Sequence, residues 1–297
     1  MDRKTFLASL TGGALLAFSS SGCFKRKRGV TVGSKNFTEQ VILGEIIAQH
    51  LEHHLQEPVT RQLNLGGTAL AQQALLNGEI DLYPEYTGTA LIAILKDPPE
   101  SDPGMVLERV RREYQQSMQL DWMDPLGINN TFVMVVRGPD ARGHHLETLS
   151  DAANLQEFWT LGVGYEFLTR SDGYGALMSG YNFQWMGAPK SMDLGLLYKA
   201  LSGGQVNMIA ANATDGLLST GDLKILKDDK QVFPPDQACI VARDDKLKNT
   251  PGLQNALQQL SGKFTNEKMQ NLNYQVDGQH RPVPEVSAEF LRQARLQ

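Results

Sequence analysis

The sequence is short of cysteine. Only two occur among its 297 residues, Cys23 and Cys239. Two cysteines exclude a fold held by several disulfides, and the chain is long enough to bury hydrophobic cores without them. Cys239 lies in the apolar run 238–242, so we predict a buried structural thiol and not a nucleophile.

Motifs for catalysis and metal binding are also lacking. The histidines include two adjacent pairs, His53-His54 and His144-His145. Neighbouring residues of a helix point in different directions, so neither pair is expected to chelate a metal ion. We find no phosphate-binding glycine-rich loop, no His-Glu-x-x-His and no nucleophile elbow. The sequence therefore makes no positive case for an enzyme, a metal site or a cofactor.

The N-terminus carries an export pattern. Basic residues precede an apolar stretch over 6–18, which is followed by the small residues 19–22. This is typical of a secretory signal peptide, predicted over 1–22, and the stretch is shorter than the roughly 20 apolar residues of a membrane span. Cys23 comes next and resembles the acylated lipobox cysteine of bacterial lipoproteins. Ser20 departs from that motif, so cleavage without acylation is the alternative.

Residues 23–29 are interpreted as a lipidated cysteine with a basic tether. More than one acyl chain would hold a soluble domain firmly at a membrane. The basic run 25–28 could instead contact nucleic acid, but the formal net charge of the whole chain is -5, which disfavours that partner. We expect a protein of the periplasm or of the outer face of the cytoplasmic membrane.

The rest of the chain alternates short apolar strands with helical segments, which predicts α/β layers. The predicted strands cover 30–33, 63–65, 80–83, 131–137, 161–164, 206–210 and 238–242. The predicted helices cover 38–51, 68–76, 89–96, 175–181 and 193–201, with a broken helical tail over 251–295. Pro84 is expected to end the third strand, and Glu39 suits the positive end of the first helix.

Polar, glycine-flanked turns follow several of these strands. Lys35, Thr68 and the run 87–89 lie in such turns, and Arg170 follows a later strand. In open α/β sheets, ligands bind beyond the carboxyl ends of the strands. Together these residues could hold a carboxylate by charge-assisted hydrogen bonds, although each alone is explained as well by a helix cap or a surface charge.

Six segments carry a family resemblance. They are VGSKNFTEQVILGEIIAQHLE (32–52), NLGGTALAQQALLNGEIDLYPEYTGTA (64–90), LGINNTF (126–132), YEFLTRSDGYGAL (165–177), ATDG (213–216) and FPPDQA (233–238). In this order they resemble the glycine betaine/carnitine/choline-binding proteins of osmoprotectant ABC transporters. The resemblance implies a two-lobed α/β periplasmic-binding-protein fold (type II), each lobe a mixed sheet flanked by helices. The implied parts are a first lobe over 30–128, a second over 129–235 and a return to the first over 236–297.

The resemblance also implies binding residues. The positions at which the family holds a ligand carboxylate are Lys35, Thr89 and Arg170. The positions at which it encloses a quaternary ammonium with tyrosines are here Tyr86, Phe132, Asn212 and Asp236. Aromatic faces attract such a cation, so replacing two of the four rings implies altered specificity.

The expected ligand is therefore a zwitterion with a carboxylate and a cationic or hydrogen-bonding head, for example an amino-acid derivative or a larger betaine such as ergothioneine. Alternatively, Asn212 and Asp236 are displaced, and Tyr174, Tyr181 or Trp185 completes the aromatic box.

The leading hypothesis is a monomeric binding protein that delivers this solute to an ABC permease and its ATPase. The lobes would close around the ligand about hinges near 128–130 and 232–237. A ligand sensor with the same fold is the alternative. An envelope enzyme is less favoured, because Ser34 and Thr89 have no evident partner histidine.

Overall fold

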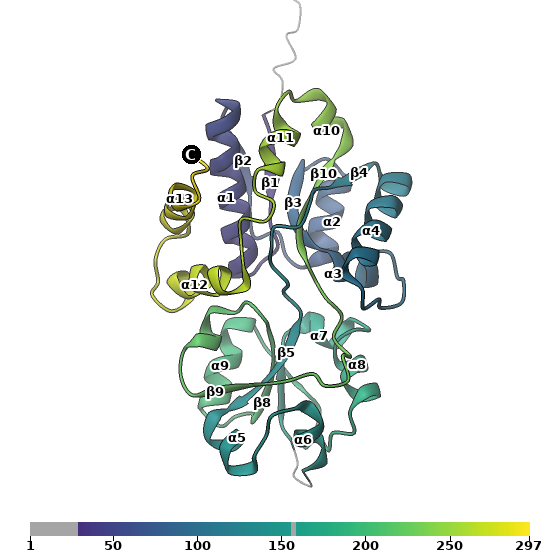
Figure 1. Ribbon diagram of the computed structural model, residues 1–297, viewed down its shortest axis with the longest axis vertical. Helices are drawn as coiled ribbons and strands as arrows, with labels where there is room; N and C mark the ends of the chain where they lie inside the picture. Colours follow the sequence, from purple (N-terminus) through teal and green to yellow (C-terminus); the bar gives the residue numbers. More distant parts are fainter. Residues whose placement is uncertain (1–28, 156–158) are drawn as a thin grey trace, which may run out of the picture.

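The computed structural model describes residues 29–155 and 159–297, which form two α/β lobes placed end to end (Figure 1). The predicted signal peptide and Cys23 lie outside the described residues. Within the described ranges, no helix has both the length and the apolar character needed to cross a membrane.

Lobe 1 is built around a mixed five-stranded sheet in the order β2-β1-β3-β10-β4. Its strands are β1 (Thr31–Gly33), β2 (Thr60–Gln62), β3 (Leu82–Tyr86), β4 (Leu120–Trp122) and β10 (Ala238–Arg243). β1 runs parallel to β2 and β3, whereas β10 runs antiparallel to β3 and β4. The strand that comes last in the chain therefore lies between strands formed by its first half.

Lobe 2 contains the second mixed five-stranded sheet, in the order β7-β6-β8-β5-β9. Its strands are β5 (Phe132–Arg137), β6 (Leu161–Val163), β7 (Lys190–Ser191), β8 (Met208–Asn212) and β9 (Leu223–Leu226). β6 is parallel to β7 and β8, and β5 is antiparallel to β8 and β9. Two mixed sheets flanked by helices confirm the predicted fold class.

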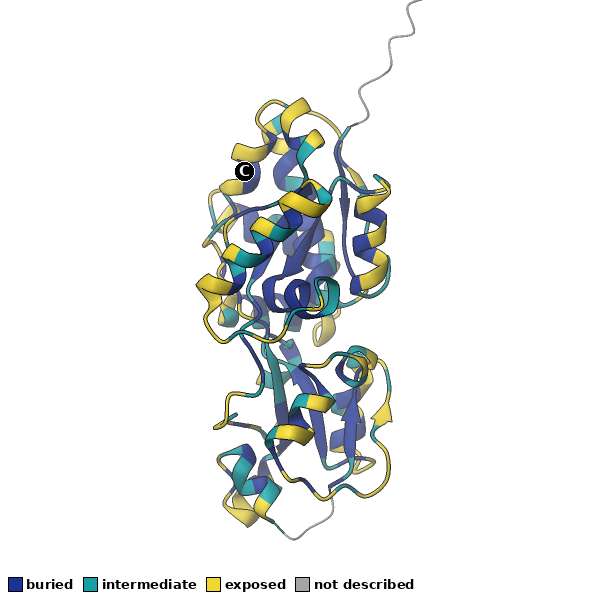
Figure 2. Ribbon diagram, turned by 90° about the vertical axis from the view of Figure 1, so that its right-hand side faces the viewer, coloured by how far each residue is buried: buried dark blue, intermediate teal, exposed yellow. Residues whose placement is uncertain are grey.

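Helices cover both sheets. Those of lobe 1 are α1 (Thr38–Leu55), α2 (Thr68–Leu76), α3 (Thr87–Thr89), which continues as a π-helical turn over Ala90–Ile94, α4 (Pro103–Met118), α10 (Asp244–Asn249), α11 (Leu253–Gln258), α12 (Asn266–Asp277) and α13 (Val283–Gln293). Those of lobe 2 are α5 (Gly138–His144), α6 (Leu149–Asn154), α7 (Tyr165–Thr169), α8 (Tyr174–Gly180), α9 (Leu194–Ser202) and a 3-10 turn (Gly216–Ser219). Figure 2 shows the consequence: the inner strands of both sheets are buried, whereas the edge strand β7 and the outer faces of the helices are exposed.

Two strand predictions were wrong. β2 ends at Gln62 instead of spanning 63–65, because Asn64 has a left-handed backbone with φ of 64° that turns the chain out of the sheet. The third strand continues through Pro84 to Tyr86. β1 pairs with β3 only at Leu82, so Pro84 has a partner strand on one side only, and its missing N–H need not interrupt a ladder.

β10, which lies between β3 and β4, is buried except at its last residue. Cys239, Ile240 and Val241 of β10 have no exposed surface, which confirms the prediction of a buried thiol. Burial raises the pKa of Cys239 to about 12, so this thiol stays protonated and unreactive.

Two antiparallel segments connect the lobes. Asn129 and Gln237 form an isolated β-bridge, and the Asn130 N–H donates to the Asp236 carbonyl over 2.9 Å. The Asp236 N–H in turn donates to Asn129 Oδ1 over 2.7 Å. These contacts join the two crossings side by side, at the positions predicted as hinges.

Candidate functional site

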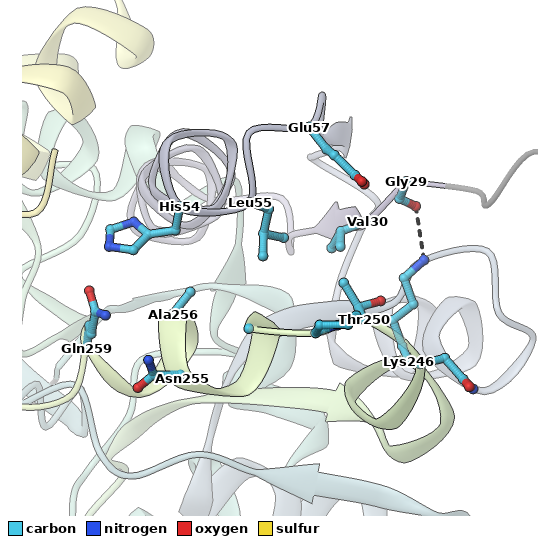
Figure 3. Close-up of a pocket in the computed structure, with 13 residues that line it drawn as sticks. Gly29, Val30, His54, Leu55, Glu57, Lys246, Thr250, Asn255, Ala256 and Gln259 are labelled. Atoms are coloured by element: carbon cyan, nitrogen blue, oxygen red, sulfur yellow. Dashed lines mark hydrogen bonds between the residues drawn. The ribbon is translucent and has the colours of Figure 1, made fainter.

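A cleft with a volume of about 1410 Å³ lies between the lobes. Its walls come from the turns after β1 and β3, from α2, α7 and α9, and from the crossing segment at Asp236. A second, smaller hollow of about 540 Å³ lies at the far end of lobe 1, between α1 and α11 (Figure 3). There Lys246 is already committed to the Gly29 carbonyl at 3.0 Å and to Asp81 at 3.0 Å, so the cleft is the better candidate.

Thr89 and Arg170, both assigned by the sequence to a ligand carboxylate, meet across the cleft. The Arg170 guanidinium, from the end of α7 in lobe 2, donates through Nη1 to Thr89 Oγ1 of lobe 1. Asp236 occupies the same place: its carboxylate accepts from the Thr89 N–H at 2.8 Å and from Thr89 Oγ1 at 2.7 Å. Arg170 Nη2 lies 3.6 Å from Asp236 Oδ2.

Asp236, which the sequence assigns to the cation end of the site, lies beside two residues assigned to the ligand carboxylate, Thr89 and Arg170. The carboxylate sits among the residues assigned to the ligand carboxylate because Asn129 fixes the backbone of Asp236 and Gly88 leaves room for its side chain. A Cβ on Gly88 would lie 3.0 Å from Asp236 Oδ1. Burial raises the pKa of Asp236 to about 6, although Arg170 and Thr89 act in the opposite direction.

Arg170 is surrounded by carboxylates. Asp172 accepts from its Nε at 2.8 Å and from its Nη2 at 2.5 Å in a bidentate pair. Burial alone would lower the pKa of Arg170, but Asp172, Asp236 and Glu166 together raise it. The guanidinium carbon also lies 5.0 Å from the centre of the Phe132 ring, a favourable cation–π contact.

Lys35 is the third residue assigned by the sequence to the ligand carboxylate. Lys35 lines the cleft but is buried, and its Nζ forms an ion pair with Glu85 at 2.6 Å and donates to Thr68 Oγ1 at 3.1 Å. No hydrogen bond joins it to Thr89 or Arg170 among the residues that the structure describes. Its Nζ lies 4.8 Å from the centre of the Tyr86 ring.

Tyr86 and Phe132 present aromatic surface on opposite sides of the cleft. Tyr86, at the end of β3, lies nearly parallel to Phe37, with ring centres 6.3 Å apart and 19° between the planes. Phe132 starts β5 and packs edge-on against Phe167 at 5.0 Å. All four line the cleft. Phe37 is an aromatic group that the sequence reading missed, although it lies inside the recognised GSKNFTEQ segment.

Asn212 is beside Phe132, its register partner between β5 and β8. The Asn212 N–H donates to Asp215 Oδ2 at 3.2 Å, and the Tyr198 hydroxyl donates to the same oxygen at 2.9 Å. Desolvation raises the pKa of Asp215 to about 7, and these two hydrogen bonds only partly offset it. The proposed substitutes Tyr174, Tyr181 and Trp185 do not line the cleft.

Glu39 is a buried carboxylate that the sequence reading assigned only to a helix end. It accepts from the Tyr86 hydroxyl at 2.6 Å, from Asn130 Nδ2 at 3.0 Å, from Asn273 Nδ2 at 3.3 Å and from the Thr214 hydroxyl. Its donors come from lobe 1, a crossing segment, α12 and lobe 2. Burial raises the pKa of Glu39, and the four hydrogen bonds act against that shift.

A further contact crosses the cleft at α2. The Thr68 N–H donates to Glu166 Oε1 of lobe 2 at 2.9 Å. Burial would raise the pKa of Glu166, but Lys35, the Thr68 N–H and Arg170 lower it below its usual value.

Across the described ranges, no group of three or more His, Cys, Asp or Glu side chains is arranged to hold a metal ion.

Two α/β lobes joined by paired crossings, with charged and aromatic side chains facing a cleft between them, define a solute-binding protein. Residues 28–293 match the family described as the substrate binding domain of ABC-type glycine betaine transport systems. The chain belongs to this family, whose members are extracytoplasmic transport proteins and not enzymes. They take a small ligand to a permease and its ATPase.

Three relatives illustrate the similarity. The carnitine transport binding protein OpuCC of Listeria monocytogenes is 35% identical over 268 residues, covering 90% of this chain and 87% of that protein. The ergothioneine transport permease/ergothioneine binding protein EgtU of Helicobacter pylori (strain G27) is 36% identical over 272 residues, covering 91% of this chain but 48% of that protein. The crystal structure of a glycine betaine/carnitine/choline ABC transporter protein superposes with a TM-score of 0.77 at 32% identity, covering 90% of this chain and 99% of the other.

Proposed function

We propose that this chain captures a small quaternary-ammonium solute between its lobes and releases it unchanged to an ABC permease. The observation that carries this proposal is the chemistry of the cleft, where aromatic rings stand among an excess of carboxylates. Six acidic side chains but three basic ones line it: Glu39, Glu166, Asp193, Asp215, Asp236 and Asp277 against Lys35, Lys96 and Arg170.

The basic groups do not cancel this excess. Lys35 is buried, Arg170 is 9% exposed, and both are paired with protein carboxylates, whereas Lys96 is exposed. A quaternary ammonium has no N–H to donate, so it is recognised by aromatic faces and by nearby negative charge. Phe37 and Tyr86 of lobe 1 and Phe132 of lobe 2 supply such faces from both sides. The cation would thereby contact both lobes and favour their approach.

Closure is proposed to occur about the two crossings at 128–130 and 232–237, between lobes that comprise 30–128 with 236–297 and 129–235. The support is the pairing of Asn129 with Gln237. A lipid anchor on Cys23 and a monomeric state are part of the same proposal. The supports for the anchor are the lipobox-like sequence and the extracytoplasmic location of the family. Labelling with a radioactive fatty acid tests the anchor, and Cys23→Ala should abolish the label.

Calorimetry on residues 24–297 tests the ligand class. Glycine betaine, carnitine, choline and ergothioneine form the panel, with glucose and glutamate as unrelated solutes. At least one quaternary ammonium should bind, and the unrelated solutes should not. Phe132→Leu keeps apolar volume but removes the ring face, so affinity should fall about 3- to 30-fold.

The matched control is Phe183→Leu, the same substitution in lobe 2 at a buried ring that does not line the cleft. It should leave the affinity within about twofold. If no quaternary ammonium binds, or if both leucine variants weaken binding equally, the proposed function is wrong.

A further inference from the structure

The Asp236 carboxylate is held by the donors that a ligand carboxylate would need. It accepts from both the N–H and the hydroxyl of Thr89, and it lies 3.6 Å from the Arg170 guanidinium. The side chain is 9% exposed. A solute carboxylate could reach Thr89 and Arg170 only by displacing that of Asp236.

No buried cation in the described part of the chain is left for a second carboxylate. Asp172 already holds Arg170 in a bidentate pair, and Glu85 holds Lys35 at 2.6 Å. Glu166 adds further negative charge near both cations. Bringing another carboxylate into this partly desolvated group would place like charges together, which is strongly unfavourable.

We propose that Asp236 is a specificity-determining residue whose internal carboxylate takes the place of a ligand carboxylate. The site therefore selects quaternary-ammonium cations without a carboxylate over zwitterionic betaines. This inference rests on the proposed function and narrows its substrate class. It reverses the zwitterion expected from the sequence, because Lys35, Thr89 and Arg170 are all engaged within the protein.

Gly88 supports the assignment. A side chain at this position would meet the Pro235 carbonyl at 2.7 Å and the Asp236 carboxylate at 3.0 Å. The turn at 87–89 and the crossing segment are therefore in contact through backbone, and the carboxylate is placed by two chain segments and not by one flexible side chain.

The test compares choline with glycine betaine, which share the trimethylammonium group and differ in having a hydroxyl or a carboxylate. The wild-type protein should bind choline at least roughly tenfold more tightly than glycine betaine. Asp236→Ala removes both the charge and the obstruction, so glycine betaine should gain at least about tenfold and choline should lose affinity. Asp236→Asn removes the charge but still fills the place, so its gain for glycine betaine should be smaller.

Asp222→Ala is the matched control. Like Asp236, Asp222 lies beside an arginine, but it pairs with Arg142 on the surface of lobe 2 outside the cleft. It should leave the choline-to-betaine ratio unchanged. Circular dichroism and thermal melting would establish that each variant is folded, and the isosteric Asp236→Asn keeps the test decisive if the alanine variant is unstable.

The outcomes separate the two proposals. If glycine betaine binds the wild type as tightly as choline, or if both Asp236 variants leave the ratio unchanged, the internal-carboxylate inference is overturned and the quaternary-ammonium function stands. If neither choline nor any betaine binds the wild type, the proposed function itself fails.

Discussion

Glu39 offers the sharpest test of how the lobes are held together. The residue is 3% exposed and accepts hydrogen bonds from Tyr86, Asn130, Thr214 and Asn273. Replacing it with alanine would remove this acceptor from all four donors, of which Asn273 Nδ2 keeps a second acceptor in the Thr214 carbonyl at 2.8 Å. Because these donors come from both lobes, a crossing segment and α12, the substitution should weaken the association of the lobes as well as the stability of lobe 1.

The magnitude follows from the number of bonds and the cost of burying the charge. A hydrogen bond to a charged group contributes about 1.5–3 kcal/mol, so four bonds would give about 6–12 kcal/mol if they were additive. Desolvation of the carboxylate, visible in its raised pKa, offsets part of this sum. We expect Glu39→Ala to lower the free energy of unfolding by about 3–5 kcal/mol, a large share of the roughly 5–15 kcal/mol typical of a folded protein.

Urea unfolding followed by circular dichroism measures this change. Glu39→Gln retains an acceptor for Tyr86 and Asn130, so its loss should be roughly 1–2 kcal/mol. Glu52→Ala is the control on the same helix, because Glu52 pairs with Arg61 at 2.7 Å in a partly exposed site and should cost about 1 kcal/mol or less. A Glu39→Ala loss no larger than that of Glu52→Ala would refute the reasoning.

Two further predictions concern pH and packing. The folded-state pKa of Asp215, about 7, lies above the ordinary value of 3.8. The contribution of Asp215 to the free energy of unfolding is therefore fully present below about pH 4 and is lost as the pH rises through 7. Melting curves should show that Asp215→Asn raises the Tm at pH 8 more than at pH 5, and an equal effect at both would contradict this. A Cβ on Gly216 would lie 2.2 Å from the Tyr274 backbone nitrogen, so Gly216→Ala should cost about 1–3 kcal/mol. Gly143→Ala, with nothing within 4 Å of its Cβ, should be neutral or slightly stabilising. Equal urea midpoints for the Gly216→Ala and Gly143→Ala variants would argue against the predicted clash at Gly216.

Local patterns were enough to predict much of the fold. The helix over 68–76 was predicted with the observed bounds, since Gly67 precedes it and Asn77-Gly78 stops it. The apolar runs that became β5 and β10 were also recognised. β4 and β9 were missed because each is a short strand at the edge of its sheet, with too few residues to show a periodic pattern.

The site was harder to predict because it depends on which segments meet. Thr89 and Arg170 lie together in the structure, yet nothing in the local sequence says that Asp236 reaches the same donors. Its position follows from the pairing of two crossings more than 100 residues apart in sequence, at Asn129 and Gln237. The local sequence around Glu39 indicates only a helix-end charge, because its partners Thr214 and Asn273 are even more remote in sequence.

The place of β10 in the first sheet has a consequence for synthesis and export. The second sheet uses only residues 132–226, so every strand of lobe 2 has emerged before β10 does. The first sheet cannot be completed until residue 243 is available, because β10 separates β3 from β4. A chain that appears from its N-terminus would therefore finish the sheet of lobe 2 first and leave β3 and β4 without the strand between them until the last quarter arrives. The β-bridge between Asn129 and Gln237 would then form late, when β10 completes the first sheet and the second crossing comes to lie beside the first.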